Sequence, residues 1–178
     1  MKTLSSVVVV KQPLDRVWVT MRDRLPELAA ALDDIESIVV VEREALRPGS
    51  VRLVNKWQSR QRIPAGFRDR LGTADLSWLD RNLWDDASHC CTWVIEPTVL
   101  TDHIRCEGST RYEPAMGGRG TRVTFTGTFD LAPGALGTFT GSLQKPVSAF
   151  VESIATTVIP RNVRKVIEAA SRLIAADP

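Results

Sequence analysis

Three polar side chains lie on strand-like patterns where they can serve a binding site: Asn55, His89 and Tyr112. Asn55 and Tyr112 fall on the strand faces that the alternation predicts to be dry. A buried amide or phenol costs about 1–3 kcal/mol unless it is hydrogen-bonded, so each needs a backbone group, a water or a ligand as its partner. His89 can act as a general base in a cavity if it shares the face of Trp93; otherwise it is an ordinary histidine near a hairpin turn.

Metal and cofactor chemistry has little support in the sequence. The carboxylate pairs Asp33-Asp34 and Asp85-Asp86 could hold a divalent metal or share a proton. Both pairs fall at predicted turns, where aspartate bonds the local backbone. No His or Cys pair has zinc-like spacing, and there is no Gly-rich phosphate loop or Ser-His-acid set. We therefore expect no metal and no cofactor.

A basic segment from Arg60 to Gly72 carries apolar residues at helical spacing among its arginines. It can form a short amphipathic turn that covers one end of a cavity and meets an anionic head group. The residues of this possible lid are Arg62, Phe67 and Arg68. The alternative is a solvated charged loop whose apolar side packs on a sheet edge.

The elements that must position these residues are mostly strands. Alternation or β-branched composition predicts strands over residues 3–10, 35–43, 51–58, 73–84, 89–96, 100–112 and 121–131. Two short helices, from Pro13 and over residues 26–33, separate the first strand from the second. Dry and wet faces alternate along the strands, which is typical of an antiparallel sheet.

A long helix is predicted over residues 143–176, where apolar residues recur every three or four positions. Its stripe must pack on the sheet, which suggests a cavity between them. Pro160 lies inside the helix and predicts a kink, because proline lacks a backbone N–H and crowds the preceding turn. We expect the part before Pro160 to face the cavity and the part from Val163 onward to form a solid core.

Composition indicates one globular domain, spanning residues 1–178. Of its 178 residues 43% are hydrophobic and 25% are charged, and the net charge of +2 does not favour nucleic acid as a partner. No apolar run is long enough for a transmembrane segment, and no signal peptide is apparent. The three cysteines include two neighbours and form a poor disulfide framework, so we expect reduced thiols and a cytoplasmic location. The composition is compatible with a homodimer.

The order of elements resembles the helix-grip fold of the START-like superfamily, also called SRPBCC, which includes the birch-pollen-allergen type. The resemblance covers essentially the whole chain and extends to short matches. These are Leu76-Ser77-Trp78 with Trp84, Arg105-Cys106-Glu107-Gly108, Gly120-Thr121-Arg122-Val123 and Ile159-Pro160-Arg161-Asn162. They look like an uncharacterised bacterial branch akin to polyketide cyclase/dehydrase-like and DUF2505-like proteins. The resemblance implies an α+β fold in which a curved antiparallel sheet of about seven strands wraps around the C-terminal helix. It also implies a pocket for a hydrophobic small molecule.

The predicted pocket wall consists of dry-face residues together with the inner face of the long helix. A lining of aromatic residues with a few polar groups is the usual composition of a small-molecule site, although a filled core would need the same residues. The expected ligand-binding residues are Asn55, Trp57, Trp78, Trp93, Tyr112, Phe125, Phe129, Phe150, Ile154 and Val158.

Three functions compete on this evidence. The first is a non-enzymatic carrier of a lipid or polyketide-like compound, which the scarcity of inward acids and bases favours. The second is an enzyme of the aromatase/cyclase type, for which Tyr112, His89 and Asn55 are the available proton-moving groups. The third is a protein-binding module, as in chaperone-ATPase activators that share this fold, which needs an exposed apolar patch.

Overall fold

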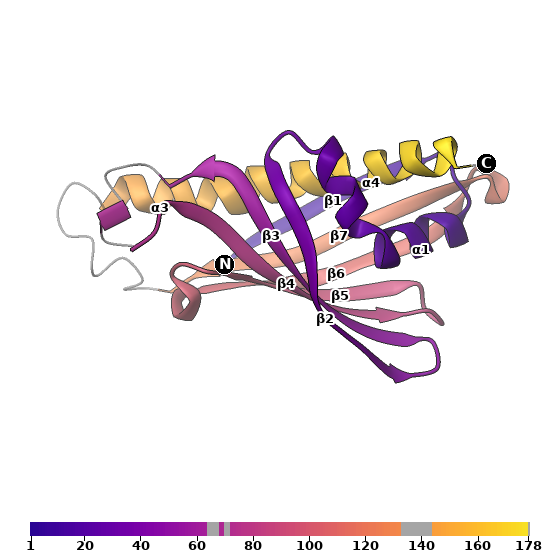
Figure 1. Cartoon of the computed structure of the whole chain (residues 1–178), viewed down its shortest axis with the longest axis horizontal. Coiled ribbons are helices and arrows are strands. Elements are labelled where there is room, and N and C mark those ends of the chain that lie inside the picture. Colours follow the sequence, from indigo (N-terminus) through magenta and orange to yellow (C-terminus); the bar gives the residue numbers. More distant parts are fainter. Residues whose placement is uncertain (64–67, 70–71, 133–143, 178) are drawn as a thin grey trace.

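The chain folds as a seven-stranded antiparallel sheet that curves around a long C-terminal helix (Figure 1). The computed structural model describes residues 1–63, 68–69, 72–132 and 144–177, with the side chains of residues 144, 147, 150, 154 and 155 left undescribed. The strand order is β1-β7-β6-β5-β4-β3-β2. The strands are β1 (Lys2–Val10), β2 (Ile35–Arg47), β3 (Ser50–Arg62), β4 (Asp75–Asp85), β5 (Cys90–Pro97), β6 (Ile104–Ala115) and β7 (Gly120–Leu131). The predicted helix-grip architecture is confirmed.

Two short helices connect β1 to β2, as predicted. The first, α1 (Leu14–Asp23), follows Pro13 and buries Val17, Trp18 and Met21. The second, η1 (Leu25–Ala31), is a 3₁₀ helix rich in alanine and leucine. The C-terminal helix consists of α3 (Gln144–Ser153), a π-helical segment (Ile154–Val158) and α4 (Ile159–Ala176). These helices close the concave side of the sheet.

Near Pro160, where a kink is predicted, the helix is π-helical from Ile154 to Val158. Proline has no N–H to donate and its ring crowds the carbonyl one turn back, so a regular α-helix cannot continue through it. A π-helical turn changes the backbone register at such a point. The Thr156 hydroxyl donates to the carbonyl oxygen of Glu152 at 2.8 Å, which provides this carbonyl with a donor within the irregular segment.

The hairpin of β2 and β3 is longer than the sequence pattern predicts. β2 continues to Arg47 and β3 to Arg62, although the residues from Val39 to Arg47 are all exposed. Residues 44–47 of β2 and 60–62 of β3, which lie beyond the two predicted strands, are all exposed, so they show no alternation of buried apolar and exposed polar residues that would predict a strand. Arg60 and Arg62, expected in a connection, therefore belong to a strand.

Both acidic pairs form ion pairs with neighbouring elements. Asp86 accepts hydrogen bonds from Trp18 Nε1 at 2.7 Å and from Arg22 at 2.6 Å, which ties α1 to the β4–β5 turn. Asp34 accepts from Arg161 of α4 at 2.7 Å. Within the described part of the chain, no group of three or more His, Cys, Asp or Glu residues is arranged to hold a metal ion.

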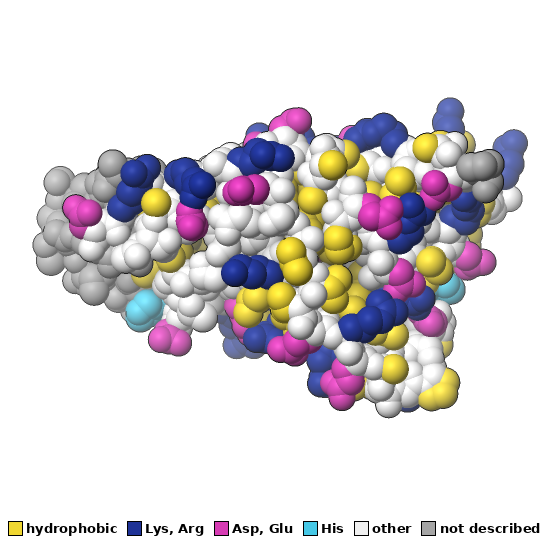
Figure 2. Space-filling view, viewed as in Figure 1, with side chains coloured by type: hydrophobic (Ala, Val, Ile, Leu, Met, Phe, Trp, Pro, Cys, Tyr) yellow, Lys and Arg dark blue, Asp and Glu magenta, His cyan; other side chains and the backbone are white. Residues whose placement is uncertain are grey.

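Buried side chains form two hydrophobic clusters on the concave side of the sheet. One joins α1, η1 and α4 to the sheet through residues such as Val17, Leu53 and Ile167. The other gathers Trp93, Phe125 and Phe129 with Val151 of α3. On the surface view in Figure 2, exposed apolar side chains are interspersed with charged ones. The core is thus divided in two, and the space between its parts is the candidate site.

Candidate functional site

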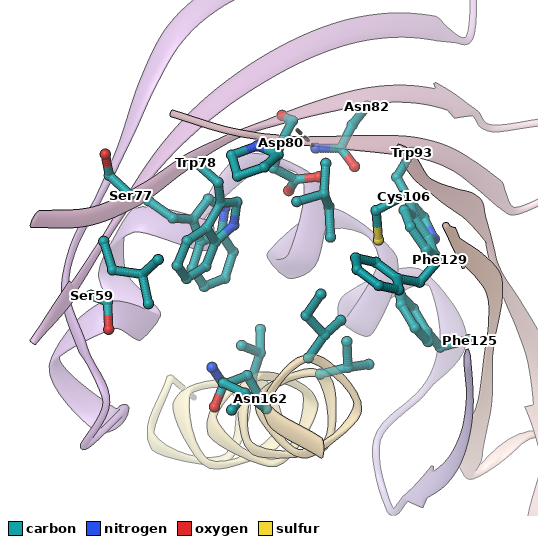
Figure 3. A pocket seen from close by; sticks show the side chains of 18 of the residues that line it. Ser59, Ser77, Trp78, Asp80, Asn82, Trp93, Cys106, Phe125, Phe129 and Asn162 are labelled. Atoms are coloured by element: carbon teal, nitrogen blue, oxygen red, sulfur yellow. Dashed lines mark hydrogen bonds between the residues drawn. The ribbon is translucent and has the colours of Figure 1, made fainter. Parts of the chain in front are cut away.

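A cavity of about 200 Å³ lies between the concave face of the sheet and the C-terminal helix. Figure 3 shows its wall, with β4 on one side and the helix carrying Asn162 on the other. Most lining side chains are apolar or aromatic, and strands β3 to β7 supply most of them. The described lining residues include Met21, Leu25, Trp57, Ser59, Ile63, Trp78, Asp80, Asn82, Trp84, Trp93, Cys106, Thr110, Tyr112, Phe125, Phe129, Val158, Asn162, Val163, Val166 and Ile167.

Many of the side chains that the sequence nominated for the pocket line this cavity. Those at the wall are Trp57, Trp78, Trp93, Tyr112, Phe125, Phe129 and Val158. Asn55 is buried but is not among the lining residues. The side chains of Phe150 and Ile154, and the whole of Phe67, lie outside the described residues.

The ring of Trp93 rests on two glycines of the neighbouring strands. It stacks on Phe125 with ring centroids 4.6 Å apart and parallel planes. A β-carbon at Gly108 would come within 2.5 Å of the indole, and one at Gly127 within 2.4 Å. Gly108 and Gly127 are register partners on β6 and β7, so together they leave room for the indole against the sheet. The absence of two side chains thus determines the shape of this wall.

Tyr112 closes the cavity at the end near α1. Its ring packs edge-on against Trp18, with centroids 5.2 Å apart, and its centroid lies 6.0 Å from that of Trp84. Burial raises the pKa of the Tyr112 phenol well above its ordinary value. At neutral pH the phenol therefore stays protonated and can act as a hydrogen-bond donor rather than as a base.

His89 lies outside the cavity, beyond the aromatic residues of this end. Its ring packs edge-on against Trp18, 5.2 Å between centroids, and its Nε2 lies 3.8 Å from the carboxylate of Asp15. Its backbone is in the left-handed region, with φ of 47°, in the turn between β4 and β5. A role as cavity base requires a shared face with Trp93, and the turn directs His89 away from that face. His89 is therefore a histidine at a hairpin turn, which is the alternative to a base in the cavity.

Sequence reasoning missed Asp80, a carboxylate on the cavity wall. Asp80 lies in the middle of β4 between its register partners Asn55 and Ile95. Burial raises the pKa of Asp80 to about 6, although the side chains of Asn82, Trp57 and Asn55 partly oppose this by favouring the ionised form. The indole N–H of Trp57 has no partner within hydrogen-bonding distance in the described structure, so its effect on the carboxylate acts over a longer range.

The signal for Asp80 is present in the alternation of β4. Trp78, Asp80, Asn82 and Trp84 share one face, and Trp78 is one of the residues predicted for the cavity wall. Two residues along a strand bring the side chain back to the same face, so Asp80 has to point the same way. The pattern over residues 73–84 is less regular than in the neighbouring strands, because polar and apolar residues occur on both faces.

The opposite wall carries one amide, Asn162 of α4, which is 8% exposed. Its Oδ1 has no hydrogen-bond partner in the described structure. Val163, Val166 and Ile167 follow it along the cavity. The expectation that the helix forms a solid core from Val163 onward is therefore wrong for the residues from Val163 to Ile167, because the cavity extends past Pro160.

The proposed lid is described only in part. Arg62 forms an ion pair with Asp75, and Arg68 Nε donates to the carbonyl of Ile63 at 2.8 Å. Both arginine side chains are exposed, whereas Ile63 is buried and lines the cavity. In the described part of this segment, the arginines thus engage local partners and the apolar side meets the cavity.

All three cysteines are free thiols. Cys106 lies on the cavity wall, and burial raises its pKa to about 12. Cys91 is buried as well, and desolvation raises its pKa well above the ordinary value. Both thiols are therefore protonated at neutral pH and behave as small apolar groups rather than nucleophiles.

Comparison with known proteins shows which fold the chain shares. No protein-family model and no curated protein sequence matches the chain. Solved structures do match over nearly all of it. A protein from Thermus thermophilus is 23% identical with a TM-score of 0.65, covering 99% of this chain and 100% of that one. The chain has the helix-grip fold of these solved structures.

Two enzymes share this helix-grip fold with the chain. The Zhui aromatase/cyclase from Streptomyces sp. R1128 is 21% identical with a TM-score of 0.63, covering 97% of this chain and 95% of that one. Norcoclaurine synthase from Thalictrum flavum is 12% identical with a TM-score of 0.61, covering 99% and 88%. At these identities the likeness concerns the helix-grip fold, and the function has to be argued from the cavity. None of the described helices is both long and apolar enough to cross a lipid bilayer.

Proposed function

We propose that this protein binds a compact hydrophobic small molecule in the cavity between the sheet and the C-terminal helix. The observation that carries this proposal is the division of the core into two clusters on either side of a largely apolar, aromatic-lined space. A protein interior is normally close-packed, with few voids larger than a water molecule. A cavity bordered by tryptophan, tyrosine and phenylalanine rings of the sheet is therefore better explained as a ligand site than as part of a close-packed core.

The apolar lining of the cavity links ligand binding to stability. A hydrophobic ligand in this space makes contacts with the aromatic and aliphatic side chains of both walls. A ligand that makes these contacts stabilises the folded state, so binding and stability should rise together.

The size of the cavity limits the ligand. Small-molecule sites typically measure about 300–1,000 Å³, so a cavity of 200 Å³ suits one or two rings. A long acyl chain or an extended polyketide would need the walls to move apart. Among the carrier functions, we therefore favour a compact aromatic or alicyclic compound.

Native mass spectrometry tests this proposal directly. The purified chain is incubated with an organic extract of hydrophobic metabolites, desalted, and examined for a mass increase. We expect one small molecule per chain, together with a rise in the melting temperature. Neither a bound molecule nor any thermal shift with a broad set of one- and two-ring compounds would contradict the proposal.

Asp80 favours a second candidate function, a cyclase-type reaction. Such chemistry needs a base that removes a proton from carbon, and a carboxylate with a pKa of about 6 is suited to this at neutral pH. Asp80 would be the base, and the protonated Tyr112 could donate a hydrogen bond to a carbonyl oxygen. Cyclisation of a short poly-β-ketone, followed by product analysis, tests this: loss of turnover in Asp80→Asn supports it, and no turnover by the native protein contradicts it.

A further inference from the structure

Building on the proposed function, we propose that the ligand is a hydrophobic amine that binds in its protonated form, with Asp80 as its counter-ion and Trp57 and Trp78 as its aromatic walls. The inference concerns the charge of the ligand, which the apolar lining alone leaves open. It depends on the position of one carboxylate relative to the groups around it.

Asp80 is the single charged side chain among the described residues that line the cavity. It projects from the middle of β4 into the space between sheet and helix (Figure 3). The described wall contains no lysine, arginine or histidine. A carboxylate in an apolar cavity without a cation is costly, and a cation supplied by the ligand is the most effective compensation.

The neighbours of Asp80 keep it available for such a ligand. Asn82 donates through Nδ2 to the backbone oxygen of Asp80 at 3.1 Å, which leaves the carboxylate itself pointing to the cavity. The side chains of Asn82, Trp57 and Asn55 lie around the carboxylate and supply neutral N–H groups only. These neutral donors favour the ionised state without cancelling its charge, so a net negative charge faces the ligand.

Aromatic rings lie beside Asp80 on the same face of the sheet. Trp57 and Trp78 are register partners, two positions along the strands from Asn55 and Asp80. Their rings are stacked, with centroids 5.7 Å apart and planes 16° from parallel, and both line the cavity. A carboxylate beside tryptophan faces is a chemical environment that attracts an alkylammonium group by both ion pairing and cation–π interaction.

The helix wall offers a further acceptor in Asn162. Its Oδ1 has no partner in the described structure, so rotation of the amide brings an acceptor towards the cavity without breaking a bond to that oxygen. An ammonium group can donate to Asp80, and Asn162 on the opposite wall stays available as an acceptor for another donor of the ligand. An anionic ligand would instead meet Asp80 with the same sign of charge.

The titratable groups that face Asp80 do not supply a competing charge. On β5 and β6 these are Cys91, Cys106 and Tyr112, whose pKa values are all raised by burial, so they stay neutral. The residues of β3 and of α4 that line the cavity with it are not titratable. Binding of a protonated amine should therefore weaken as the pH falls through the titration of Asp80.

Isothermal titration calorimetry with three ligands of one shape tests the inference. The ligands are naphthylethylamine, naphthylethanol and naphthylacetic acid, measured at about pH 8, where the amine is protonated and Asp80 is ionised. The proteins are the native chain, Asp80→Asn, and Asp102→Asn as the matched control. Asp102 is exposed and lies outside the cavity, so its replacement removes the same charge without changing the wall.

We expect the native chain to bind the amine about 10- to 100-fold more tightly than the alcohol, and Asp80→Asn to lose this preference while retaining the alcohol. Asp102→Asn should behave like the native chain. Equal binding of amine and alcohol, or tighter binding of the acid, would overturn the amine inference but leave the proposed function standing. Failure of all three ligands to bind the native chain would overturn the proposed function as well.

Discussion

Asp80 makes the stability of the folded chain depend on pH in a direction unusual for an aspartate. Its pKa is about 6 in the fold against an ordinary value of 3.8, so the folded state holds the proton more tightly. Its contribution is therefore most favourable below about pH 4 and is lost as the pH rises through 6. A difference of about two in pKa corresponds to about 3 kcal/mol.

Replacing Asp80 by asparagine should remove this dependence. We predict that Asp80→Asn raises the free energy of unfolding by up to about 3 kcal/mol at pH 8, and that the difference disappears near pH 4. Urea denaturation across this pH range, native and variant in parallel, measures it. Asp102→Asn serves as the surface control and should stay within about 0.5 kcal/mol. Parallel curves for Asp80→Asn and the native chain would show that Asp80 is not held in a costly ionised state.

Gly108 and Gly127 determine where Trp93 can lie. A methyl group at Gly108 would lie 2.1 Å from the carbonyl oxygen of Thr126 on β7 and 2.5 Å from the indole, so both the pairing of β6 with β7 and the position of the ring on Phe125 have to change. We predict that Gly108→Ala destabilises the fold by about 1–3 kcal/mol and changes the near-ultraviolet circular dichroism. Ser109→Ala, on the opposite face of the same strand, is the control and should change little. An unchanged near-ultraviolet spectrum in Gly108→Ala would contradict the packing of the Trp93 ring against Gly108 and Gly127.

At the scale of elements, α1 is anchored to the β4–β5 turn through Asp86. This carboxylate accepts from Trp18 Nε1 and from Arg22, both on α1. We predict that Asp86→Ala lowers the free energy of unfolding by about 1–3 kcal/mol, because the buried indole N–H loses its acceptor. The neighbouring Asp85 bonds Ser88 within its own turn, so Asp85→Ala should have a smaller effect in the same urea denaturation experiment. Equal losses in both variants would contradict the anchoring role.

Half-buried strands could be predicted from the sequence, whereas fully exposed strand ends could not. Alternation on β3, β6 and β7 predicted the cavity faces correctly, because each of these strands is half-buried. The ends of β2 and β3 were missed because residues 44–47 and 60–62 are all exposed and show no alternation. Pro160 predicted a kink, whereas the π-helical segment from Ile154 to Val158 has no counterpart in the periodicity.

At the scale of the whole molecule, the sequence predicted the fold and most of the aromatic wall but not the polar part of the site. Trp57, Trp93 and Tyr112 could be assigned to the cavity wall because large apolar side chains indicate which face of a strand is buried. Asp80 could not be singled out by residue type, because most aspartates are solvated. The alternation of β4 places Asp80 on the face of Trp78, but its position opposite α4 on the cavity wall is seen only in the folded structure.

The central claim concerns the cavity as a binding site, and filling it is the most direct test. Val163 projects from α4 into the cavity, so Val163→Phe should occupy part of the space that a ligand needs. The measurement is an isothermal calorimetric titration of the native chain and Val163→Phe with the neutral two-ring probe naphthylethanol. We predict saturable binding of one probe per native chain, and at least about tenfold weaker binding by a Val163→Phe chain that is folded and no less stable. Absence of saturable binding to the native chain, or equal binding by both proteins, would contradict the claim that this cavity takes a hydrophobic ligand.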